Sequence, residues 1–114
     1  MKAKDLIPSG ISHNVLSAGT FFKGDITTTD DFRLDGKLEG NIECKGKVVI
    51  GPKAEVAGNI KCQNADFMGR IHGNVLIEDT VSLKASVVFT GEIEAKFLEI
   101  EPGATFNGTC KMIN

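Results

Sequence analysis

Apolar and polar residues alternate along most of the chain around one motif, apolar-x-Gly-x-apolar, which occurs six times. The intervals between its central glycines are 16, 18, 15, 18 and 17 residues. A recurring interval of this size indicates stacked structural units, one for each repeat. The copies are Phe22–Ile26, Leu38–Ile42, Val56–Ile60, Ile71–Val75, Phe89–Ile93 and Phe106–Cys110.

A second set of apolar residues lies between the motifs and also alternates with polar residues. Such alternation predicts short strands with one buried face. Turn-forming residues such as Asp30-Asp31, Gly51-Pro52 and Pro102-Gly103 interrupt it. Because no stretch has a 3.6-residue period, we expect almost no helix outside the N-terminal segment. The second set is Phe32, Leu34, Val48, Ile50, Phe67, Ile77, Val81, Leu83, Leu98 and Ile100.

Each repeat therefore carries several short strands, too many for one hairpin and too regular for a sandwich. We predict an all-β fold, a single-domain parallel β-solenoid of about six turns over residues 19–114. Successive turns would lie ~4.8 Å apart and form a rod core roughly 25 to 30 Å long. Residues 1–18 are expected to form a tail that is flexible, caps the solenoid or contacts a membrane.

The motif glycines have the same inward parity as the apolar residues two positions before and after them. Two explanations are open: a side chain would crowd a tight corner, or the bend needs a positive φ. Either one predicts that Gly58→Val or Gly73→Val is more destabilising than an ordinary surface change. The six repeat-corner glycines are Gly24, Gly40, Gly58, Gly73, Gly91 and Gly108.

Charge and composition exclude some functions. The 13 basic and 15 acidic residues are interspersed, for a net charge of -2, which argues against a nucleic-acid surface. No stretch approaches 18 consecutive apolar residues, and residues 1–18 lack the apolar core of a secretory signal. We therefore expect an intracellular, cytoplasmic protein, with peripheral contact at the inner face of the cell membrane as an option.

Three cysteines are present, and two of them, Cys44 and Cys62, each lie four residues after a motif glycine. They should stack on adjacent turns. A metal or redox pair is one interpretation, but we favour two small buried side chains. The chain has no Cys-x-x-Cys and no further ligands at zinc spacing, so no metal and no cofactor is predicted.

The sequence also lacks a convincing catalytic set. His72 occupies an outward slot, and the pairs Glu92/Glu94 and Glu99/Glu101 alternate with apolar residues as on a solvated face. Hexapeptide-repeat acyltransferases are also solenoids, but the glycine intervals do not keep a six-residue phase. We predict no enzyme; a left-handed coil would support the acyltransferase alternative.

The repeat resembles the bactofilin family of bacterial cytoskeletal proteins over about residues 19–112. The residues that carry this resemblance are Phe32-Arg33-Leu34-Asp35-Gly36-Lys37-Leu38-Glu39-Gly40-Asn41-Ile42, with Gly19–Ile26 before them and Gly51–Ile60 after. The resemblance implies a right-handed β-helix of roughly triangular section that assembles end to end into nucleotide-independent, non-polar filaments. It also implies membrane attachment in many members and a scaffold role for cell-wall enzymes or other morphogenetic proteins. Family members commonly carry longer tails than this chain shows.

Physical reasoning also predicts self-association. The end turns of a solenoid expose unpaired backbone groups and one apolar layer, which monomeric repeat proteins cover with a cap. Only Lys111 to Asn114 follow the last motif, and no cap is evident there. We therefore expect a polymerisation interface that includes Phe106, Met112 and Ile113, with Phe22 as a further candidate.

The N-terminal segment has two further interpretations. Leu6, Ile7 and Ile11 could cap the first turn or make a lateral contact, or they could bind a membrane together with Lys2 and Lys4. A disordered segment is the remaining possibility.

A binding module is the alternative function. In that case an outer face with Asn41, Asn59 and Asn74 in one repeated slot would dock a partner protein or a polysaccharide. The simpler interpretation is that Asn suits a position beside Gly at a bend.

Overall fold

The computed structural model describes residues 13–113, and in this part of the chain every regular element is a strand. All strand pairs are parallel. The strands are β1 (His13–Leu16), β2 (Phe21–Lys23), β3 (Ile26–Thr28), β4 (Asp31–Leu34), β5 (Lys37–Glu39), β6 (Ile42–Cys44), β7 (Lys47–Ile50), β8 (Glu55–Ala57), β9 (Ile60–Cys62), β10 (Asn64–Phe67), β11 (Arg70–Leu83), β12 (Val88–Ile100) and β13 (Thr105–Met112).

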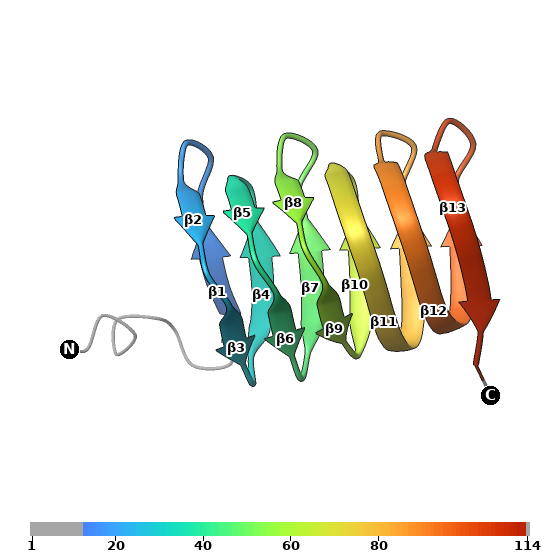
Figure 1. Cartoon of the computed structure of the whole chain (residues 1–114), viewed down its shortest axis with the longest axis horizontal. Coiled ribbons are helices and arrows are strands. Elements are labelled where there is room, and N and C mark those ends of the chain that lie inside the picture. Colours follow the sequence, from blue (N-terminus) through green and yellow to red (C-terminus); the bar gives the residue numbers. More distant parts are fainter. Residues whose placement is uncertain (1–12, 114) are drawn as a thin grey trace.

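The strands wind into a β-solenoid of about six turns, as the repeat predicts. In Figure 1 the strands nearest the viewer run downward and those behind run upward while the chain advances from left to right. This path is a right-handed coil, the hand preferred for parallel crossover connections. The described residues therefore do not form the left-handed coil that would support an acyltransferase.

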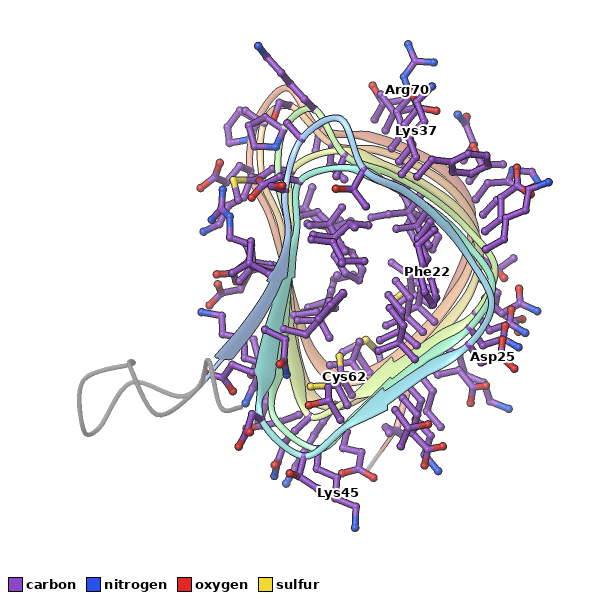
Figure 2. All side chains as sticks on the ribbon, turned by 90° about the vertical axis from the view of Figure 1, so that its left-hand side faces the viewer. Phe22, Asp25, Lys37, Lys45, Cys62 and Arg70 are labelled. Atoms are coloured by element: carbon purple, nitrogen blue, oxygen red, sulfur yellow. The ribbon has the colours of Figure 1, made fainter. Side chains whose placement is uncertain are left out.

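Three faces surround the interior, as the view along the solenoid axis shows (Figure 2). The first face contains β1, β4, β7, β10 and the ends of β11 and β12. The second contains β2, β5, β8 and the beginnings of β11, β12 and β13. The third contains β3, β6, β9 and the middle of β11 and β12, with the end of β13.

The core consists of inward side chains that stack in columns along the axis. Nearly all of the second apolar set is at most 3% exposed, which confirms its predicted inward position. The exceptions are Leu98, which is partly buried, and Ile100, which is 52% exposed. Both lie on the last turn, where no further turn of the described chain covers them.

The solenoid begins earlier than the boundary at residue 19 that the sequence suggested. Strand β1 pairs with β4 through His13↔Asp31 and Leu16↔Leu34, so it already belongs to the first turn. Leu16 packs against the core in the column of Leu34, which explains why this segment joins the sheet.

Three strands are also longer than the short strands expected from the sequence. Strands β11, β12 and β13 continue through Gly73, Gly91 and Gly108, which pair with one another in register. The preceding turns break into separate strands at the equivalent glycines. Hydrogen bonding between neighbouring turns nevertheless continues there, since the Gly40 and Gly58 amides donate to Ala57 and His72 carbonyls at 3.0 Å.

Candidate functional site

The C-terminal end of the solenoid presents an apolar surface, which we name the C-terminal surface. Its members are the last residues of the inward columns. Phe106 stacks on Phe89 with ring centroids 5.4 Å apart, and Ile100 and Met112 are 52% and 53% exposed. The C-terminal surface comprises Leu98, Ile100, Phe106, Cys110 and Met112.

The opposite end presents the N-terminal surface, formed by the first residues of the same columns. Leu16, Phe22 and Ile26 are partly buried and pack against the core. Asn14 and Thr28 complete this surface, and the Asn14 side-chain amide donates to the Thr28 hydroxyl at 2.9 Å. The labelled Phe22 side chain lies inside the coil at the end that faces the viewer in Figure 2.

Exposed large apolar side chains gather near the two ends. Val15 and Phe21 lie in the first turn, and the others lie in the last two turns at Val88, Phe97, Ile100 and Met112. Ion pairs join neighbouring turns on the outer faces along the whole described solenoid, from Lys23–Glu39 at one end to Lys84–Glu101 at the other. In the middle turns, Lys47 Nζ lies 2.8 Å from Asp66 Oδ2, and Lys37 Nζ lies 3.9 Å from Glu55 Oε2.

The predicted interface residues therefore lie at two separate places. Phe106 and Met112 belong to the C-terminal surface, and the neighbouring Ile113 is partly buried, with its amide donating to the Ala95 carbonyl at 2.8 Å. Phe22 lies at the opposite end of the column that contains Phe106. Leu6, Ile7 and Ile11 lie outside the described residues.

The structure combines both explanations for the motif glycines. Gly73 has a φ of +147°, and a Cβ built on it would overlap the carbonyl oxygen of Gly58. The same overlap with the preceding turn recurs at the motif glycines from Gly40 to Gly108. Stacked turns therefore leave no room for a side chain at this corner.

The Cys44 and Cys62 thiols are buried on adjacent turns, at the last residues of the paired strands β6 and β9. Their Sγ atoms donate to the carbonyls of Asp30 at 3.1 Å and Asn64 at 3.2 Å. Desolvation by burial raises the pKa of both thiols, which disfavours the thiolate needed for metal binding or nucleophilic attack. This geometry favours the packing interpretation, and within residues 13–113 no three potential metal ligands converge.

The polar residues considered for chemistry have structural or solvated environments. His72 is exposed on the second face. Glu99 accepts the Ser82 hydroxyl at 3.0 Å, and Glu101 accepts the Ala85 amide at 3.0 Å. These contacts use the carboxylates to join adjacent turns.

A groove of about 880 Å³ runs along the second face. Its charges are mixed, and the pairing of Lys37 with Glu55 already uses two of them, so it favours no single class of ligand. The groove is lined among others by Phe21, Lys37, Glu55, Arg70, His72 and Val88.

The repeated asparagines form a hydrogen-bonded ladder that supports their structural interpretation. The Asn59 amide N–H donates to Asn41 Oδ1 at 3.0 Å, and the Asn74 N–H donates to Asn59 Oδ1 at 3.1 Å. Asp25 begins the ladder by accepting the Asn41 N–H at 3.0 Å. The side-chain oxygens therefore bind the neighbouring turn and do not point to a ligand.

Sequence reasoning missed several residues of the end surfaces. Asn14 lay in the segment taken as a tail, and Thr28 is polar at an inward position, so neither matched the apolar pattern. The outward Phe21 and Phe97, 55% and 54% exposed, were also missed. Their signal was the unusual placement of Phe at polar positions of the alternation.

Two curated relatives come from Myxococcus xanthus (strain DK1622). The chain is 28% identical to Bactofilin BacO over 102 residues, which cover 90% of this chain and 81% of BacO. It is 27% identical to Bactofilin BacP over 111 residues, which cover 96% of this chain but only 46% of BacP. No solved structure matches the chain significantly.

A sequence profile for the family described as "Bactofilin: Polymer-forming cytoskeletal" matches residues 14–111. The matched segment begins one residue after the start of β1 and ends within β13, so it spans the solenoid described above. With this match over most of its length, the chain belongs to the bactofilin family of polymer-forming cytoskeletal proteins.

Proposed function

We propose that this protein is a non-enzymatic filament subunit that assembles end to end without nucleotide into non-polar filaments. The filaments act as a cytoplasmic scaffold for cell-shape or cell-wall machinery. The proposal rests on the incompletely covered apolar columns at the ends of the solenoid, where Ile100 and Met112 are more than half exposed, and on the match to a polymer-forming family.

Backbone pairing adds to the attraction between copies. Within residues 13–113, strands β1, β2 and β3 each pair with a strand of the second turn only, and β13 pairs with β12 only. Each end of the described solenoid therefore has a strand edge with free N–H and C=O groups. Such edges pair readily with another chain.

Apolar burial favours the same contact. Covering the exposed side of one large side chain such as Phe106 contributes up to about 2 kcal/mol. Several side chains of this kind lie on the C-terminal surface, so a junction there gains both apolar burial and strand pairing.

The test is negative-stain electron microscopy of the purified chain without nucleotide, where we expect filaments. Phe106→Arg should give much smaller species, because a junction would bury an unpaired charge among apolar side chains. Ala57→Arg is the matched control, since Ala57 is exposed on an outer face of a middle turn. Filaments of Phe106→Arg that equal those of the wild type in length and amount would refute the role of the C-terminal surface.

Membrane contact remains a separate prediction. The candidate residues are Leu6, Ile7 and Ile11, which would contact either a membrane or the first turn. Contact with a membrane would attach the protein peripherally to the inner face of the cell membrane. Within the described part of the chain no helix could span a membrane. Co-sedimentation of the full chain and of a chain lacking residues 1–12 with anionic vesicles separates the two possibilities.

A further inference from the structure

The two end surfaces differ in polarity although they belong to the same columns. Two inward columns begin with a polar residue at the N-terminal end and continue with apolar residues or cysteines to the C-terminal end. Asn14 begins the column that contains Phe32 and ends at Leu98. Thr28 begins the column that contains Cys44 and ends at Met112. The C-terminal surface has no polar side chain of this kind among the described residues.

The polar pair at the N-terminal end makes a junction there costly. The Asn14 amide donates to Thr28 Oγ1 at 2.9 Å, and the same oxygen accepts the Asp30 amide at 3.1 Å. Asn14 has a second amide hydrogen and a carbonyl oxygen beyond this bond. Burying these groups against an apolar surface would leave them without water, which opposes association.

The strength of a junction therefore depends on which end surfaces of the two chains meet in it. A head-to-tail junction would place Asn14 opposite Leu98 and Thr28 opposite Met112 if the columns continued across it. A junction between two C-terminal surfaces instead brings apolar residues against apolar residues. A junction between two N-terminal surfaces buries Leu16, Phe22 and Ile26 but also two copies of the polar pair.

We propose that assembly is hierarchical: two copies first join through their C-terminal surfaces, and these dimers then join through weaker N-terminal junctions. The partner of the C-terminal surface is thus a second copy of the same surface. This inference rests on the proposed end-to-end assembly and adds an order to its two junctions.

The chain contains a natural probe for the first junction. Cys110 is exposed on the C-terminal surface, whereas Cys44 and Cys62 are buried. In a head-to-tail rod of six-turn subunits, successive Cys110 thiols would lie about 29 Å apart. Only a junction between two C-terminal surfaces brings two Cys110 thiols within reach of a short bis-maleimide.

The first experiment treats the reduced wild-type chain with such a cross-linker at concentrations where assembly is detected by sedimentation. We expect covalent dimers and no larger covalent species, because each chain offers one accessible thiol. Cys110→Ser should abolish the product, and a cross-linked dimer that forms equally in denaturant would overturn the interpretation. Assembled chains without the covalent dimer would overturn the junction between two C-terminal surfaces, and with it the non-polar filament, while leaving end-to-end self-assembly intact.

The second experiment compares Phe22→Arg with Phe106→Arg, two substitutions at opposite ends of one column. Sedimentation velocity across a dilution series should show Phe22→Arg as a persistent dimer. Phe106→Arg should dissociate to monomers at concentrations roughly tenfold or more above the dissociation midpoint of the Phe22→Arg dimer. Circular dichroism confirms that both variants keep the β fold.

The outcomes distinguish the two levels of the proposal. A wild-type chain that stays monomeric at all concentrations would overturn the proposed function itself. Assembly in which Phe106→Arg dimers outlast Phe22→Arg dimers on dilution would overturn only the hierarchy.

Discussion

Gly73 shows how a single hydrogen atom in place of a side chain maintains the spacing of the turns. Its φ of +147° is a conformation that other residues rarely adopt, and the Gly58 carbonyl oxygen occupies the place of a Cβ. Gly24 has a similar φ of +135°, but no preceding turn of the described chain lies beside it. A Cβ there would meet only the Phe22 ring, at 3.5 Å.

The two glycines therefore separate backbone strain from steric overlap. We expect Gly24→Ala to lower the free energy of unfolding by about 1–2 kcal/mol, from strain alone. Gly73→Ala should cost at least about 4 kcal/mol, because two backbones must also move apart. Urea unfolding of dilute protein measures both, and equal losses would show that overlap between the turns does not contribute.

Among the elements, the asparagine ladder joins successive turns at a bend of the coil. Asn41 and Asn59 each accept the amide N–H of the equivalent residue on the next turn. These bonds lie at the bend between the second and third faces, beside the motif glycines. They connect turns where β2, β5 and β8 are interrupted before β3, β6 and β9.

Replacing Asn59 should therefore weaken the contact between two turns without affecting the core. We expect Asn59→Ala to cost about 1 kcal/mol of unfolding free energy, the usual net value of one hydrogen bond. Asn59→Asp retains the acceptor oxygen and should recover most of the loss. Asn107→Ala, an exposed change on β13, is the control, with an expected effect within about 0.5 kcal/mol. Similar losses for Asn59→Ala and Asn107→Ala would argue against the ladder.

At the scale of the whole molecule, each turn contacts only its neighbours, so the two end turns have half the partners of a middle turn. A second copy at either end supplies the missing neighbour. Folding and assembly are therefore linked, because binding to the folded state raises its stability with concentration.

Thermal unfolding should show this linkage. The wild-type midpoint should rise with protein concentration, on the order of 5 °C for a tenfold increase where one junction per chain forms. Phe106→Arg should have a smaller dependence, since it lacks the junction through the C-terminal surface. A wild-type midpoint independent of concentration, in samples that sediment as polymers, would show that the junctions do not stabilise the fold.

The sequence by itself determined the repeat, the parity of the inward residues and hence an all-β solenoid of about six turns. These features follow from local alternation and a regular interval, which need no knowledge of distant contacts. Phe106 and Met112 could also be assigned to the sixth turn, because they belong to or directly follow the sixth motif.

Only the tertiary structure decided which residues the ends expose and why the motif glycines are needed. The pairing of β1 with β4 brought Asn14 beside Thr28, a contact between residues 14 positions apart that no local pattern reveals. Likewise, the overlap at Gly73 depends on the Gly58 carbonyl of the preceding turn. The physical reason is the same in both cases. The coil must form before turns stack at a fixed distance and before some residues lie at an end without a neighbouring turn.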